Sequence, residues 1–179
     1  MITIYQKPLN LIKNLALIMS VMMVFSLEAA SKKEMPKVSY QLSSPKSEKV
    51  NLRLAITRQE HAQGLSGIKP GDFPNDAGML FVNDEMGIRQ FWMPDTYFNL
   101  DMIFLDQDLK IVFIEKNAPA HPGTIEPPVI FRGKPQRAQF ILETKANSKF
   151  SKDLKIGDQL KWIGPISLSE IALKTRQQQ

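Results

Sequence analysis

The feature that most constrains the fold of this chain is a series of short apolar runs separated by turn-forming residues. The runs are rich in aromatic and β-branched residues, and they occupy residues 78–82, 88–93, 100–105 and 110–116. The segments between them contain Asn, Asp, Gly or Pro, and Asp106 and Asp108 in the last one favour a tight hairpin. Runs of this length are typical of strands, and strands that follow one another closely usually pair antiparallel. We therefore expect a mostly β domain.

Two further patterns flank these runs. Residues 50–56 alternate between apolar and other residues, which predicts a strand with one buried face. Thr57 and Glu60 have the spacing of a capping box, and Gly64 suits a helix end, so a short helix should follow. Further strands are expected at residues 138–144 and 159–163, and a small helix at 168–173. The predicted class is α+β and mostly β, as a compact antiparallel sheet or partly closed barrel with one or two short helices.

Residues 1–31 have the pattern of a secretory signal peptide. Lys7 and Lys13 precede an uncharged stretch at 15–27, and small residues follow at 29–31. The stretch is about 13 residues long, whereas a membrane-spanning helix needs roughly 20. We therefore expect export to the periplasm or the cell exterior with no stable membrane span after cleavage. An uncleaved N-terminal tether is the alternative.

The rest of the chain divides into three parts by composition. Residues 32–49 are polar and contain prolines, so they are interpreted as a flexible spacer. Residues 50–164 form the predicted single β-rich domain, and residues 165–179 form a C-terminal tail. The long segment 118–137 holds five of the twelve prolines, and loops of this kind usually have a function or are disordered.

Composition excludes several function classes. The chain has no cysteine, which rules out thiol nucleophiles, thiolate metal sites, disulfides and a lipid-modified cysteine. The formal charge of +5 becomes +4 without the leader, which carries two lysines and one glutamate. The basic residues are scattered and lack interleaved aromatics, so no nucleic-acid partner is expected. There is no Gly-rich phosphate loop, Ser-centred elbow or paired-His metal motif, and we expect no metal or other cofactor.

Three motifs in the strand region resemble a known family. Residues 78–81 read Gly-Met-Leu-Phe, residues 91–96 read Phe-Trp-Met-Pro-Asp-Thr, and residues 100–106 read Leu-Asp-Met-Ile-Phe-Leu-Asp. Their order and spacing resemble the bacterial and archaeal family called domain of unknown function 192. Smaller matches extend the resemblance over about residues 50–162 and are found at Arg58, 64–65, 111–112, 142–143 and 157–158. The sequence departs from the family at Ser66, usually Met, and at Pro94-Asp95, usually Lys-Asn.

The resemblance implies a compact, mostly β domain with a small helix, often exported and without an established biochemical role. It therefore indicates the fold better than the function. The change at Asp95 places an acid where the family has a neutral amide, so a ligand preference carried by that position would differ here.

The densest group of candidate site residues lies at 91–101. Trp92 offers a flat apolar wall, and Asp or Thr side chains give directional hydrogen bonds, a mixture used by small-ligand sites. The alternative is that Trp92 and Met93 are core residues and that Asp95 and Thr96 satisfy turn backbone. In that case Asp101 would pair with Arg58 or Arg89. The candidate ligand-binding residues are Arg58, Trp92, Met93, Asp95, Thr96, Asp101 and Glu143.

Several functions remain open. The leading hypothesis is a non-catalytic exported domain that binds a small molecule, peptide or envelope component in a groove covered by the Pro-rich loop. The second is a hydrolase or lyase with Asp101 and Asp95 as acid and base, assisted by His121, or a divalent cation held by these acids and Glu143. The third is a structural accessory protein without a ligand. A copper site is a further alternative, because thioether sulfur suits Cu(I); it would use Met79, Met86, Met93 and Met102.

Overall fold

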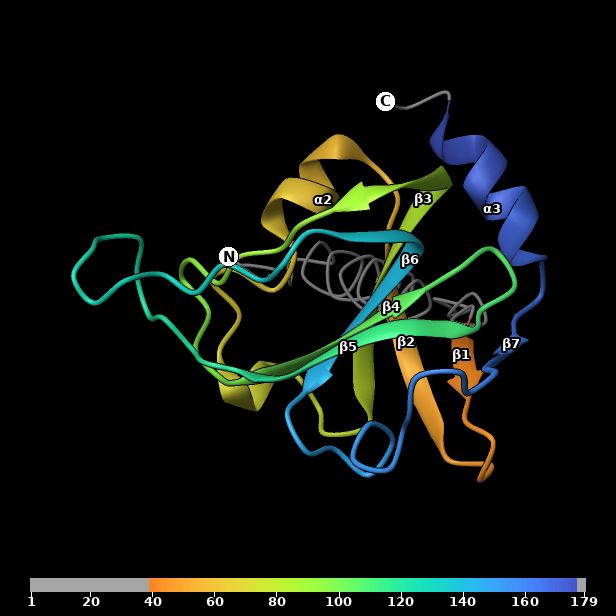
Figure 1. The fold of residues 1–179 in the computed structure, drawn as a ribbon, viewed down its shortest axis with the longest axis horizontal. Helices are drawn as coiled ribbons and strands as arrows, with labels where there is room; N and C mark the ends of the chain where they lie inside the picture. Colours follow the sequence, from red (N-terminus) through yellow and green to blue (C-terminus); the bar gives the residue numbers. More distant parts are fainter. Residues whose placement is uncertain (1–38, 177–179) are drawn as a thin grey trace, which may run out of the picture. The chain divides into compact units, whose positions relative to one another are not determined.

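The fold is built on one sheet of seven strands within residues 39–176, which are the residues that the computed structural model describes. Figure 1 shows the strands with two α-helices beside them. The strands are β1 (Tyr40–Ser43), β2 (Lys49–Ala55), β3 (Ala77–Arg89), β4 (Leu100–Leu105), β5 (Ile111–Ala118), β6 (Gln136–Lys145) and β7 (Lys161–Ile163). The helices are α2 (Arg58–Gln63), the 3₁₀ turn η1 (Pro70–Asp72) and α3 (Leu168–Thr175).

The strand order is β5-β4-β6-β3-β2-β1-β7, and the sheet is mixed. The pair β2–β3 is parallel, with Leu54 opposite Leu80, whereas the other strand pairs in the described chain are antiparallel. A parallel pair needs a crossover connection, and here it is supplied by α2, η1 and the turns between β2 and β3. The predicted α+β, mostly β class with short helices is confirmed. The sheet is not closed into a barrel, however. The expected antiparallel pairing is also wrong for β2 and β3, which are parallel.

Strand β3 differs from the sequence prediction. Residues 78–82 and 88–93 were expected to be two strands with a turn at 83–87, but Ala77–Arg89 is a single strand. Its register against β6 shifts between Val82 and Gly87. The buried Asn83 bridges the irregularity, because its Nδ2 donates to the Gln139 carbonyl at 2.8 Å and Gln139 Nε2 donates back at 3.1 Å. The polar residues at 83–87 have the composition of a turn, but in the structure they form a bulge within one continuous strand.

The domain begins before the predicted boundary at residue 50. Strand β1 lies within the predicted spacer and pairs with both β2 and β7, and its Leu42 is fully buried. The prolines and polar residues around β1 indicated a flexible segment, but one buried leucine and two pairing partners hold it in the sheet. The predicted signal peptide, residues 1–31, lies outside the described residues.

The C-terminal helix is confirmed as part of the fold. Sequence predicted a small helix at 168–173, and α3 extends over Leu168–Thr175. Its Leu168, Ile171 and Ala172 are buried in the core, so this helix is not part of a free tail. No helix within residues 39–176 is long and apolar enough to cross a membrane.

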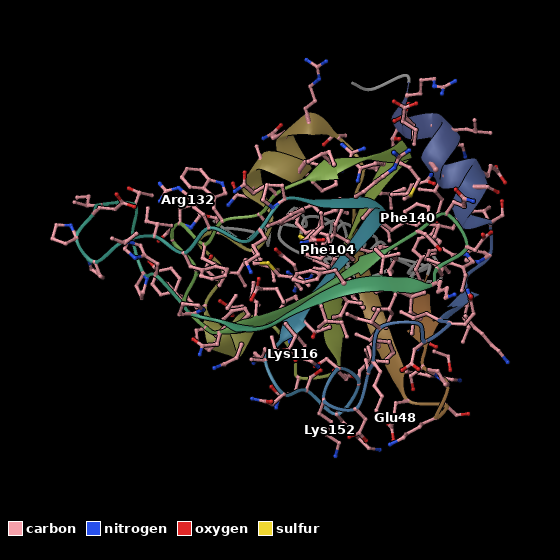
Figure 2. All side chains as sticks on the ribbon, in the orientation of Figure 1. Glu48, Phe104, Lys116, Arg132, Phe140 and Lys152 are labelled. Carbon is pink, nitrogen blue, oxygen red and sulfur yellow. The ribbon has the colours of Figure 1, made fainter. Side chains whose placement is uncertain are left out.

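The sheet carries a hydrophobic core on each face. One contains Leu80, Val82, Ile103, Phe140 and Leu142, and also receives α3. The other contains Met79, Phe81, Met102, Phe104 and Ile141. Alternation along β3, β4 and β6 sends neighbouring residues to opposite faces, and Figure 2 labels Phe140 from the first core and Phe104 from the second. The candidate site lies on the second face.

Candidate functional site

The start and end of α2 determine where its side chains lie. Thr57 Oγ1 accepts from the Glu60 backbone N–H at 3.1 Å, and Glu60 Oε2 accepts from the Thr57 backbone N–H at 2.9 Å. The predicted capping box is therefore present. Gly64 ends the helix with a φ of 50°, a left-handed conformation that glycine adopts readily, and its added Cβ would meet the Phe81 ring at 3.2 Å. The tight turn brings residues 61–66 against β3.

A small cavity of about 50 Å³ lies between this turn and the sheet. The segment 91–96 and the buried strands β4 and β6 complete its wall. Residues that line it include His61, Gly64, Ser66, Phe81, Phe91, Trp92, Met93, Thr96, Leu100 and Glu143. A more open cleft of about 330 Å³ is also lined by His61, Phe81, Phe91 and Trp92, so the cavity and the cleft share a wall.

Glu143 is the acidic group of the cavity. It lies on β6 opposite Met79 of β3 and Met102 of β4, and only 4% of the residue is exposed. Among the described residues, no side chain or backbone group donates a hydrogen bond to its carboxyl. Burial raises the pKa of Glu143 from 4.5 to about 8, because the charged form is poorly solvated there. At pH 7 the group is therefore mainly a neutral carboxylic acid.

His61 is the second titratable side chain of the cavity wall. Its Nε2 lies 2.9 Å from the Ala55 carbonyl oxygen and must donate to it, because a carbonyl only accepts. The ring packs edge-on against Phe81 with 5.5 Å between centroids. Burial lowers the pKa of His61 below 6.5, so the imidazole is neutral at pH 7.

Four of the seven candidate ligand-binding residues line this cavity, namely Trp92, Met93, Thr96 and Glu143. Trp92 is 55% exposed, and the Arg132 guanidinium lies 5.7 Å from the centre of its ring. Figure 2 labels Arg132 at the side of the domain from which the loop after β5 projects. Met93 and Thr96 are buried, and their backbones pair with Phe131 and His121.

Two candidates near the cavity do not line it. Arg58 is exposed on the first turn of α2. Asp95 has a φ of 49°, and its Oδ1 accepts from the Gly123 backbone N–H at 3.1 Å. Asp95 thus satisfies turn backbone, which is the structural alternative that the sequence offered.

Asp101 lies on the opposite face of the sheet from Glu143. Its register partner on β6 is Thr144, so its side chain points toward the first core. Both oxygens are occupied: Oδ1 accepts from the Asn117 N–H at 2.9 Å, and Oδ2 accepts from the Asn147 N–H at 3.1 Å and from Ser151 Oγ at 2.6 Å. Lys116 Nζ is 3.6 Å from Oδ2. Asp101 thus has buried partners, as the structural alternative requires, but they are not the Arg58 or Arg89 that it named.

The arrangement does not bring the three predicted carboxyl groups together. Within residues 39–176 there is no group of three or more His, Asp or Glu residues placed to hold a metal ion. The ring of His121 contacts the Ile125 carbonyl through Nε2 at 3.1 Å, and His121 is buried outside the cavity wall. Met79, Met93 and Met102 pack in the second core, as methionine commonly does.

The Pro-rich segment does not cover the cavity. Residues 119–135 connect β5 to β6 and extend away from the sheet in Figure 1. The segment is tied to residues 92–96 by the bridges Thr96–His121 and Trp92–Arg132. None of its residues lines the cavity or the adjoining cleft. Its expected role as a lid is therefore wrong.

Sequence reasoning missed the lining residues that come from α2, from the turn after it, from β3 and from the segment after β3. His61, Ser66, Phe81 and Phe91 line it but were not candidates. The capping box located α2, so His61 could be assigned to a short helix, but its direction depends on the parallel crossover. No local sequence pattern predicts that β2 and β3 are joined by a parallel crossover.

Comparison with known proteins supports the fold and leaves the function open. The family model DUF192, described as an uncharacterized ACR, matches residues 40–162. No curated protein matches the chain.

Two solved structures are similar to this fold. One is a proposed transcription regulator from Sinorhizobium meliloti 1021, with 26% identity, a TM-score of 0.56, and coverage of 70% of this chain and 92% of that chain. The other is a protein of unknown function from Novosphingobium aromaticivorans DSM 12444, with 24% identity, a TM-score of 0.55, and coverage of 75% and 95% respectively.

Proposed function

The chain belongs to the uncharacterised DUF192 family, and we propose that it is an exported, non-catalytic domain that binds a ligand in the cavity between α2 and the sheet. The ligand would be a small molecule, or one end of a peptide or envelope component. Export rests on the leader pattern at residues 1–31, and binding rests on the geometry of the cavity.

Glu143 is the observation that supports binding best. Burying a carboxyl group is costly, so such a group is usually retained where something else meets it. Here the group lines a cavity next to an open cleft with aromatic walls. Apolar walls combined with a few polar groups are the common composition of ligand sites.

The catalytic alternative has weaker support. It needs Asp101 to exchange protons with a substrate, but Asp101 is fully buried on the other face and its oxygens are held by three donors. A general acid or base must come within hydrogen-bond reach of the reacting group. The cavity that is present therefore favours binding.

The test is native mass spectrometry of the protein recovered from the envelope of its host. We expect an additional mass that is lost on denaturation, and a substitution at the cavity mouth should remove it. Ala62 is an exposed residue of α2 that lines both cavity and cleft, so Ala62→Phe should lower ligand occupancy at least tenfold. Gln59→Phe is the matched control, because Gln59 is exposed on the same helix and does not line either space.

Two results would contradict binding at this place: a bare chain mass for the native protein, or equal occupancy in Ala62→Phe and Gln59→Phe. Export is tested separately by the N-terminus of the protein in envelope fractions. A mature chain that begins near residues 30–32 is expected, and one that begins at Met1 would contradict cleavage.

A further inference from the structure

We propose that the cavity binds the primary ammonium group of an organic amine, with the carboxylate of Glu143 as its counter-ion. This inference rests on the proposed function, because it names the chemical class that the same cavity accepts. It follows from the charges, the hydrogen-bond acceptors, the aromatic rings and the size of the cavity.

The charges of the lining residues favour a cation. Glu143 supplies an acid, whereas no lysine or arginine among residues 39–176 lines the cavity itself; Arg89 lines the adjoining cleft. His61 is the other titratable group on its wall and is neutral at pH 7. An anionic group inside the cavity would be buried beside Glu143 without a positive partner in the cavity wall, which is unfavourable. A cationic group would supply the positive partner that the ionised carboxylate of Glu143 does not have in the cavity wall.

The hydroxyl groups of the cavity also favour a ligand that donates hydrogen bonds. Ser66 Oγ donates to the Pro94 carbonyl at 3.1 Å, and Thr96 Oγ1 donates to the same oxygen at 3.2 Å. A hydroxyl has one hydrogen, so both groups are left with lone pairs that can only accept. An ammonium group has three N–H donors and no acceptor, and it therefore matches a cavity that offers acceptors.

The aromatic residues support the same assignment. Phe81 and Phe91 both line the cavity and pack edge to face, with 4.7 Å between ring centroids. Trp92 lines the cavity and the cleft. The faces of such rings attract cations, so they help to replace the water that the ammonium group loses.

The volumes define how the ligand would lie. About 50 Å³ corresponds to one or two water molecules, enough for an ammonium group and the carbon that carries it. The remainder of the ligand would lie in the cleft of about 330 Å³, beside Phe91, Trp92 and the exposed Ile88. A primary amine with an apolar body fits both spaces.

Binding should depend on pH with a defined sign. In the free protein burial keeps the Glu143 carboxyl protonated up to about pH 8, and the cation binds the ionised form. The affinity should therefore increase by nearly tenfold per pH unit well below pH 8, and level off above it. The groups opposite Glu143 on β3 and β4 are Met79 and Met102, which do not titrate, and protonation of His61 at low pH would oppose the cation further.

The experiment compares n-pentylamine, n-pentanol and pentanoate, which are similar in size and differ in charge. Binding is followed by the NMR shift of the Trp92 indole N–H, and Trp162 is an internal reference because it does not line the cavity or the cleft. Primary alkylamines stay charged to about pH 10. We expect pentylamine to bind at least tenfold more tightly than pentanol at pH 9, and roughly a hundredfold more weakly at pH 6 than at pH 9.

Two variants test whether Glu143 is the cause of the preference for the amine and of its pH dependence. Glu143→Gln should remove both the preference for the amine and its pH dependence, while pentanol binding and the melting temperature show that the domain is folded. Glu115→Gln removes a carboxyl from β5 outside the cavity, and it should behave like the native protein.

The outcomes distinguish this inference from the proposed function. Equal or tighter binding of pentanol or pentanoate at Trp92 would overturn the amine assignment and leave a binding cavity. Undiminished amine binding in Glu143→Gln would also overturn it. If none of the three compounds shifts the Trp92 signal, the amine assignment is wrong, and the adduct in native mass spectrometry still decides whether the cavity binds another ligand.

Discussion

Two buried carboxyl groups, Asp101 and Glu143, lie on opposite faces of the sheet in very different surroundings. Asp101 accepts hydrogen bonds from Asn117, Asn147 and Ser151, and it faces a lysine. The two asparagines donate through their backbone N–H groups and have φ values of 55° and 58°, in the left-handed region. Glu143 has apolar neighbours and a cavity. Asp101 therefore holds loops in place, whereas Glu143 borders the cavity for which we propose a ligand.

Glu143 should make the domain less stable as pH rises. An acid with a folded-state pKa of about 8 and an unfolded-state value of 4.5 binds more protons in the folded state between those pH values. The free energy of unfolding should therefore fall by about 1.4 kcal/mol per pH unit within that window and level off outside it. Urea denaturation from pH 5 to 9 measures this slope. Glu143→Gln should lose this part of the slope, and equal slopes in the two proteins would contradict the assignment.

Asp101→Asn should destabilise the domain without changing the cavity. The amide offers one acceptor oxygen where the carboxylate has two, so at least one N–H would lose its partner, at a cost of about 1–3 kcal/mol. Thermal melting measures this loss. Asp153→Asn is the control, because Asp153 pairs with Lys46 at the surface and its loss should leave stability nearly unchanged. Unchanged melting of Asp101→Asn would show that this network contributes little.

Sequence reasoning was partly successful at the scale of residues. The position of Asp101 between Leu100 and Met102 in an apolar strand correctly indicated that a buried acid needs partners. The partners were not predictable, because Asn147 and Ser151 lie more than 40 residues further along the chain. Trp92 and Thr96 were recognised because they lie at or just beyond the end of the strand predicted at 88–93. Phe81 resembled any other core residue.

Among the elements, those defined by local chemistry were predicted best. The capping box of α2 was recognised because Thr57 and Glu60 contact each other across three residues. Strand β1 was missed because its stability comes from β2 and β7, which are distant in sequence from one another. The prediction divided β3 into two strands because its bulge contains polar residues. The hydrogen bonds between Asn83 and Gln139 that hold the bulge in the sheet join distant parts of the chain, so the local sequence does not indicate them.

Strand β1 should be essential for the fold. It lies between β2 and β7, so removing it takes away one of the two partners of β2 and the partner of β7 in the described sheet. A chain of residues 50–176 should show no cooperative unfolding by circular dichroism, whereas residues 39–176 should unfold cooperatively. Leu42→Ala is a smaller change at a fully buried position and should cost about 2–5 kcal/mol. Cooperative unfolding of residues 50–176 with the stability of the longer chain would contradict this role.

At the scale of the whole domain, the two cores share the same strands and should unfold together. Phe140 and Phe104 lie in different cores, and both come from paired central strands, β6 and β4. Calorimetry of residues 39–176 should show one transition. Phe140→Leu and Phe104→Leu should each lower its temperature, by several degrees per kcal/mol lost. Two transitions, each shifted by one variant, would show that the cores are independent.

The parallel pair β2–β3 has a consequence for the order of folding. The β4–β5 hairpin closes over a few residues, whereas β2 and β3 must be joined across the crossover that carries α2. Contacts between distant residues form more slowly, because loop closure costs entropy before the contacts repay it. The cavity wall contributed by α2 should therefore assemble late. A ligand would then meet its binding site only in molecules that have completed the crossover, and it would slow unfolding while leaving the rate of folding nearly unchanged.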